Sequence, residues 1–180
     1  MLVLCLLFSA KLMAQPWHQL TLNDFQNVPP SGNTGYAAYT NCQISYNYTP
    51  RQVNGRFYLD FDVSMTMNRS KSWMNKANVM QTGTLEVVMR HEQGHYNMAY
   101  LEQRELLQAF VQARYGPNYA NQVKDIFSAV NKKYHDLNEQ YELSSMHSLN
   151  REKQAEWDTW FRSQLGSNNY NTYTDNRTTR

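Results

Sequence analysis

The chain has 180 residues, of which 41% are hydrophobic and 18% are charged, and its formal net charge is +2. This length predicts one domain, and the composition supplies enough apolar material for a core while excluding a highly charged disordered chain. Lys and Arg residues are scattered along the chain without a basic stripe, so we expect no nucleic-acid partner.

The first residues predict an export signal. An apolar run over 2–10 is followed by Ala14-Gln15, the order of a hydrophobic region and a cleavage site in a secretory signal peptide. The run is shorter than the about 20 apolar residues that cross a bilayer, so we expect no stable membrane insertion after cleavage. We therefore predict a signal peptide over 1–14, a single domain over 15–165, a disordered polar tail over 166–180, and a secreted or periplasmic protein.

Residues 15–72 have the pattern of strands and turns. The segment 37–48 alternates in part, and after a turn at 50–55 the segment 57–67 alternates between apolar and polar residues without a break. These two segments predict an antiparallel hairpin with one buried face. Cys42 is the only cysteine that remains after signal cleavage, and we expect it to be a small buried strand residue.

The remaining residues have a helical period. One long helix is predicted from about Thr84 to before Gly116-Pro117, and a second begins near Asn118 with an apolar seam that should pack on a neighbouring helix. A third helix is predicted over 150–165. The order of elements predicts an α+β fold, in which an N-terminal antiparallel β-hairpin or small sheet is followed by a long helix and a C-terminal helical pair.

The long helix carries the sequence His91-Glu92-Gln93-Gly94-His95. In this HExxH pattern the two histidines lie on one helix face, where both imidazoles can reach one zinc ion, and the glutamate can deprotonate a water. We therefore predict His91 and His95 as zinc ligands, Glu92 as the general base, and a zincin-like fold. Gly94 costs about 1 kcal/mol relative to Ala in a helix, which a close backbone approach would explain. The alternative is a pair of solvated histidines, and the apolar flanks of the motif argue against it.

A catalytic zinc takes three protein ligands and keeps one position for water, so a third ligand must come from elsewhere. Candidates near the end of the second predicted helix are His147, Glu139 and Glu142. Spacing alone favours His147 slightly, because it lies at a junction between two helices. Glu102 and Glu105 follow the motif on its own helix, and we expect them to be solvated charges.

Several short motifs recur in one known family at matching spacing. They are Asp24-Phe25 with Pro29-Pro30, residues 37–40 with 44–46, Ser72-Trp73, the 91–95 motif, and the late series Tyr141-Glu142, 146–148, Gln154 and Trp157. Through these motifs the chain resembles the bacterial family catalogued as domain of unknown function nine-two-two, described as predicted secreted zinc-dependent proteases. The resemblance covers most of the chain after the predicted signal.

The resemblance implies roles for three further residues. It makes His147 the leading third zinc ligand, and it implies that Tyr141 lies near the site, where a phenol could stabilise an oxyanion. A core position fits the helical seam equally well for Tyr141. Asn97 stands where the family often has Asp, and it is a candidate hydrogen-bond partner for a ligand imidazole.

Together these features predict an exported zinc-dependent metallopeptidase, a monomer that acts on a peptide or protein substrate. In this mechanism Zn2+ is held by His91, His95 and His147, and Glu92 takes a proton from the attacking water. Two alternatives stay open, a zinc-dependent amidase acting on the cell wall and a non-catalytic exported zinc-binding protein. A fourth protein ligand would favour the last, because structural zinc sites are closed by four protein side chains.

Overall fold

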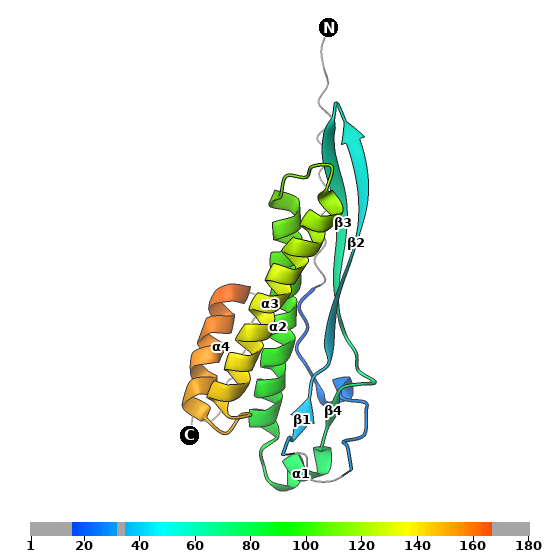
Figure 1. Cartoon of the computed structure of the whole chain (residues 1–180). Helices are drawn as coiled ribbons and strands as arrows, with labels where there is room; N and C mark the ends of the chain where they lie inside the picture. Colours follow the sequence, from blue (N-terminus) through cyan, green and yellow to red (C-terminus); the bar gives the residue numbers. More distant parts are fainter. Residues whose placement is uncertain (1–15, 32–34, 167–180) are drawn as a thin grey trace.

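The computed structural model describes residues 16–31 and 35–166, so the predicted signal peptide and nearly all of the predicted tail lie outside the described residues. The fold is α+β, as predicted, with antiparallel strands first in the chain and helices after them (Figure 1). In chain order the elements are η1 Leu22–Asp24, β1 Ala38–Tyr39, β2 Cys42–Val53, β3 Arg56–Met67, β4 Trp73–Met74, α1 Lys76–Gln81, α2 Leu85–Gln112, α3 Tyr119–Ser145 and α4 Arg151–Leu165.

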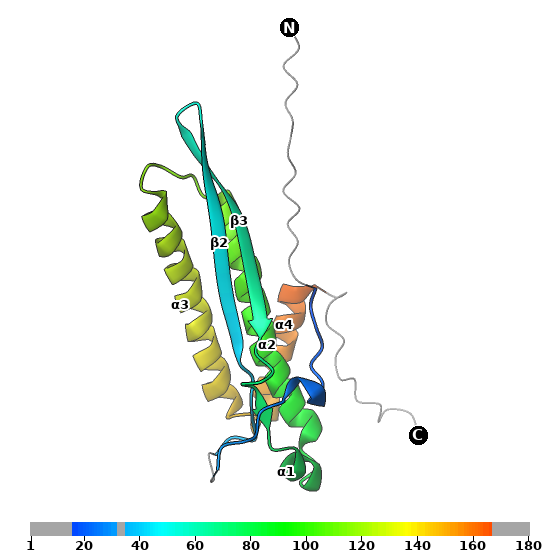
Figure 2. The same ribbon diagram turned by 90° about the vertical axis from the view of Figure 1, so that its right-hand side faces the viewer.

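Strands β2 and β3 form a long antiparallel hairpin that runs beside helix α2 (Figures 1 and 2). Its apolar face packs on the helices through aromatic contacts, with the ring of Tyr46 against Phe110 of α2 and Phe127 of α3. The predicted hairpin is therefore confirmed. The turn is tighter than predicted, because β2 continues through Pro50 and the turn consists of Asn54-Gly55, with φ of 50° and 78°. These left-handed conformations match the twist of a two-residue hairpin turn.

Helix α2 is the centre of the molecule, since it contacts the hairpin, strand β1 and the other three helices. Helices α2, α3 and α4 begin and end close to the predicted positions, and the Asn150 side chain caps α4 by accepting a hydrogen bond from the Lys153 backbone. No helix in the described part of the chain has the length and apolar character needed to cross a bilayer.

The sequence pattern missed helix α1 and the pairing of β1 with β4. Both strands have two residues, too few to show a period of two. Their pairing sets Ala38 opposite Met74 and Tyr39 opposite Trp73. Because β1 also contacts α2, the chain just after it is held beside the middle of that helix, where the HExxH motif lies.

Candidate metal centre

The HExxH motif lies in the buried middle of α2. His91 and Glu92 are buried, the side chain of His95 is 13% exposed, and the flanking Met89 and Met98 are buried in the core. The histidines are therefore not the solvated pair that was the alternative. Burial of two imidazoles and a carboxylate is costly unless each polar atom has a partner, so their partners define the site.

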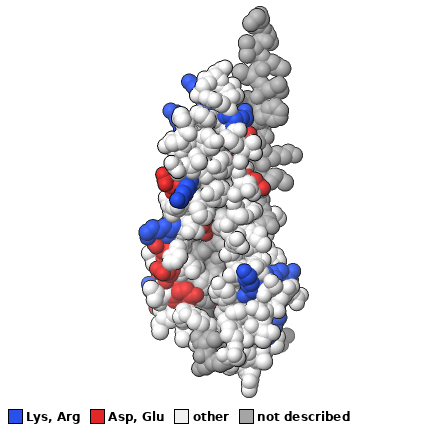
Figure 3. Space-filling view, turned by 45° about the vertical axis from the view of Figure 1, so that its right-hand side comes forward, with Lys and Arg blue, Asp and Glu red and all other residues white. Residues whose placement is uncertain are grey.

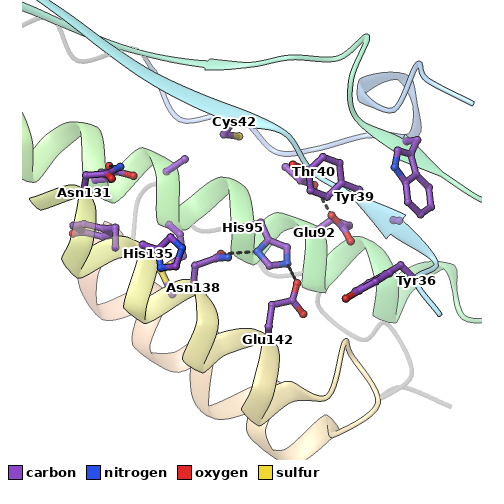
Figure 4. Close-up of a pocket in the computed structure, with 16 residues that line it drawn as sticks. Tyr36, Tyr39, Thr40, Cys42, Glu92, His95, Asn131, His135, Asn138 and Glu142 are labelled. Carbon is purple, nitrogen blue, oxygen red and sulfur yellow. Dashed lines mark hydrogen bonds and ion pairs between the residues drawn. The ribbon is translucent and has the colours of Figure 1, made fainter. Parts of the chain in front are cut away.

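Three ligand atoms converge above this face of α2, and the third comes from α3. The Nε2 atoms of His91 and His95 are 3.2 Å apart, and the Glu142 carboxylate approaches His95 Nε2 to 2.9 Å and His91 Nε2 to 3.4 Å. Figure 4 shows Glu142 reaching from α3 to His95 on α2. Among the described residues these three form a group that could hold a metal ion.

The spacing of these atoms suits a tetrahedral zinc ion. Zinc bonds to nitrogen and oxygen are about 2.0–2.1 Å, so two ligand atoms of one tetrahedron lie roughly 3.3 Å apart. The separation of 3.2 Å between the two Nε2 atoms is close to that edge. Three protein ligands would leave one position for water, the arrangement of catalytic rather than structural zinc.

Two amide side chains orient the histidines. His95 Nδ1 lies 2.7 Å from Asn138 Oδ1, and His91 Nδ1 lies 3.2 Å from Gln154 Oε1. An amide oxygen only accepts, so each Nδ1 carries a proton and donates it, and the Nε2 of each ring points to the place where a metal ion could bind. Gln154 is itself fixed, because its amide nitrogen donates to Asp158 Oδ1 and to the Tyr141 hydroxyl.

The same contacts set the protonation of the cluster. Burial lowers the pKa of His95, but its hydrogen bond to Glu142 and the charges of Glu92 and Glu142 outweigh burial and raise the pKa overall. Burial would raise the pKa of Glu142, and hydrogen bonds to His91 and His95 bring it below its ordinary range instead. Both shifts favour a proton on His95 beside an ionised Glu142, and a metal ion would have to displace that proton.

His147 lies at the predicted junction between α3 and α4, but it is not a member of the group of three and contacts only Glu142 within it. Its Nδ1 is 2.5 Å from Glu142 Oε2, and 46% of its side chain is exposed. Met146, His147 and Ser148 all have positive φ, so the chain turns sharply past the end of α3 and carries His147 beyond the point where the other ligands meet. The geometry favours Glu142 as the third ligand and His147 as the residue that holds its carboxylate. Glu139, the other candidate, is exposed to solvent.

Tyr141 occupies the core position rather than the position expected for an oxyanion donor. It is fully buried, its ring stacks on His91 at 4.7 Å between centroids, and its hydroxyl donates to the His91 carbonyl oxygen at 2.9 Å. Neighbouring residues on a helix point about 100° apart, so when Glu142 faces the cleft Tyr141 packs beneath it. Tyr141 therefore supports the backbone of the motif.

The close approach expected at Gly94 is confirmed. A Cβ on Gly94 would lie 2.2 Å from the Tyr141 hydroxyl oxygen and 2.5 Å from its ring carbon Cζ. We expect Gly94→Ala to lower the free energy of unfolding by about 1–3 kcal/mol, because the buried Tyr141 ring cannot move aside without breaking its hydrogen bonds. Urea unfolding of both proteins measures this. If the free energy of unfolding rose by about 1 kcal/mol, the difference in helix propensity between Gly and Ala, the Tyr141 ring would be free to move aside.

Glu92 faces a cleft beside the ligand group. Its carboxylate accepts a hydrogen bond of 2.6 Å from Thr40 Oγ1, which the β1–β4 pair brings to this position. The cleft has a volume of about 540 Å³ and is bounded by α2, α3 and the chain around β1. Cys42 also lines it; it lies in strand β2 as expected but is half-buried rather than buried. Burial raises the pKa of its thiol to about 12, so the thiol stays neutral.

Asn97 does not contact a ligand imidazole, contrary to the expectation. It is fully buried, and its Oδ1 accepts hydrogen bonds from Trp17 Nε1 at 2.8 Å and from Gln93 Nε2 at 3.1 Å. Its place on α2 turns it toward the N-terminal segment, away from α3. The orienting roles belong to Asn138 and Gln154, which sequence reasoning did not assign because they come from other helices.

The fold is α+β, and two histidines of the central helix α2 form, with Glu142 of α3, a group able to hold a metal ion. The chain belongs to the family described as bacterial protein of unknown function, DUF922, whose model matches residues 18–148. This confirms the resemblance seen in the sequence. No curated protein and no solved structure matches the chain.

Proposed function

We propose that this protein is an exported zinc-dependent metallopeptidase with a zincin-like site, in which His91, His95 and Glu142 hold the zinc and Glu92 is the general base. The observation that carries the proposal is the convergence of two imidazole Nε2 atoms and one carboxylate next to a second, buried carboxylate that faces a cleft. The sequence motif supports zinc in particular, because HExxH with nitrogen and oxygen ligands suits that ion.

Each residue has a task in this chemistry. A zinc ion held by His91, His95 and Glu142 would supply a Lewis acid, able to make water acidic near neutral pH and to polarise a carbonyl group. Glu92 accepts the proton of the attacking water, and the Thr40 hydroxyl holds one carboxylate oxygen so that the other is available. Asn138 and Gln154 accept hydrogen bonds from Nδ1 of the two histidines, which directs both Nε2 atoms at the point where the ion would bind.

Two features support a catalytic over a structural metal. The ligand group has three members within the described ranges, and a structural zinc site is closed by four. A structural site also needs no further carboxylate beside its ligands, whereas Glu92 lies there and is only 3% exposed. The cleft is within the usual size range of ligand sites.

The test is metal analysis joined to a hydrolysis assay. We expect the purified protein to contain about one zinc per chain and to cleave members of a mixed peptide library, and we expect a chelator to stop cleavage and added zinc to restore it. Cell-wall fragments with amide bonds form a second substrate arm, because cleavage of those alone would indicate the amidase alternative. Full zinc occupancy with no hydrolysis of either class would refute the enzyme and favour a binding protein.

Export and the monomeric state are parts of the same proposal. Export is proposed from the apolar run over 2–10, and the protein would then meet its peptide or protein substrate outside the cytoplasm. The monomeric state is proposed from the length, which suits a single domain. Fractionation of cells, with an antibody against the protein, tests the export. Recovery of the full-length chain in the cytoplasm would contradict it.

A further inference from the structure

The cleft does not end at the ligand group. Its lining on α2 includes Glu92, His95, Ala99 and Glu102, residues spaced by three or four and therefore on one face of the helix. Figure 4 shows how far the cleft extends, with Tyr36 at one end, Asn131 of α3 at the other, and His95 and Glu142 between them. The cleft therefore has a second region, near Asn131, that the proposed chemistry does not use.

A buried carboxylate occupies this second region. Glu102 is only 9% exposed, in contrast to the solvated charge that the sequence predicts, and its Oε1 accepts a hydrogen bond from Asn131 Nδ2 at 2.9 Å. Burial raises the pKa of Glu102, and the hydrogen bond from the Asn131 amide offsets this only in part. A carboxylate in such a place is costly to keep unless something charged or polar meets it.

Within residues 16–31 and 35–166, no Lys or Arg lies beside Glu102 in the cleft. The described residues that line the cleft include no Lys or Arg, while they include three glutamates. Two nearby basic residues have other partners: Arg104, two residues after Glu102, donates to the Gln164 carbonyl oxygen, and Lys133, two residues after Asn131, pairs with Glu105. Figure 3 likewise shows Lys and Arg dispersed over the face that it presents, with Asp and Glu gathered in its lower left part.

The surroundings of Glu102 suit a long cationic side chain. Met98 and Ala99 on α2 and the ring of Tyr134 on α3 also line the cleft, so an aliphatic stem would have apolar contacts before its charged end reached the carboxylate. Glu102 is two helical turns from His95, roughly 10 Å along the axis at 1.5 Å per residue. An extended peptide covers that length in about three residues.

We infer that Glu102, together with Asn131, forms a specificity subsite that takes a Lys or Arg side chain of the peptide substrate, within about three positions of the cleaved bond. This inference rests on the proposed function and adds a substrate class to it, namely peptides with a basic residue near the cleavage point. The Glu102 carboxylate binds the cation, and Asn131 holds that carboxylate in place. The Tyr134 ring and the apolar side chains of Met98 and Ala99 exclude water.

Matched peptides that differ only by Lys or Gln at each of three positions on either side of the cleaved bond test the inference. We expect wild type to prefer Lys at one of these positions by about ten- to hundredfold in kcat/KM, the range for a hydrogen bond to a charged group. Glu102→Gln should remove this preference and leave the Gln peptides within about twofold, because only the charged contact is lost. Glu139→Gln is the matched control, since it removes an exposed carboxylate of α3 outside the cleft lining, and it should keep the preference.

A binding measurement separates this inference from the proposed function. In the Glu92→Gln background, fluorescence anisotropy with a labelled Lys peptide should show weaker binding once Glu102→Gln is added, while the matched Gln peptide is unaffected. If wild type cleaves nothing but this difference in binding is found, the peptidase proposal fails and the subsite stands. Hydrolysis without any preference for Lys or Arg, or a preference that survives Glu102→Gln, overturns the subsite. Glu102→Gln should melt no lower than wild type, because it removes a buried charge.

Discussion

Glu92→Gln should abolish peptide hydrolysis, with kcat lowered by about a thousandfold or more, while the protein still binds one zinc per chain. General-base catalysis contributes about 10²- to 10⁴-fold, and a glutamine at this position has no basic oxygen that could take a proton. The substitution keeps the shape of the side chain and an oxygen for the Thr40 hydrogen bond, so the cleft should not change. Steady-state kinetics on a fluorogenic peptide and metal analysis of the same sample measure the two quantities.

The matched control for this variant is Glu86→Gln. It makes the same chemical change on the same helix, at a side chain that is 53% exposed and pairs with Arg90. We expect its kcat to stay within about twofold of wild type, since exposed pairs contribute little. Equal activity of Glu92→Gln and wild type would show that another group accepts the proton, and loss of zinc in Glu92→Gln would show that Glu92 is a ligand.

The second large effect is expected at Glu142. Glu142→Ala should weaken zinc binding by far more than His147→Ala, because Glu142 belongs to the ligand group and His147 contacts only its carboxylate. Loss of a residue that orients a ligand costs about 10- to 100-fold in metal affinity, which is the range we expect for His147→Ala. Competition with a zinc-binding dye measures the dissociation constants of both variants.

Glu142→Gln is the control that separates charge from shape in this comparison. It keeps the size of the side chain and loses the anionic oxygen, so its zinc affinity should fall between those of wild type and Glu142→Ala. Lower affinity in His147→Ala than in Glu142→Ala would contradict the geometry and restore His147 as the third ligand, as the family resemblance implies.

The local pattern of the sequence determined the central helix, its HExxH motif and the strand hairpin before it. Each of these depends on spacing within one segment, such as the four-residue step from His91 to His95 or the alternation along 57–67. The need for glycine at position 94 was visible as well, because a costly residue in a helix indicates a close contact even when the partner is unknown.

Only the tertiary structure decided which residues on other elements meet that motif. Glu142 and His147 lie five residues apart in the sequence, and the turn after α3 separates the ligand position from the supporting one. The same packing buries Glu102 against α3, places Asn138 and Gln154 behind the histidines, and turns Tyr141 beneath His91. Sequence spacing contains the period of each helix but not the rotation of one helix against another, and that rotation decides which side chains share a site.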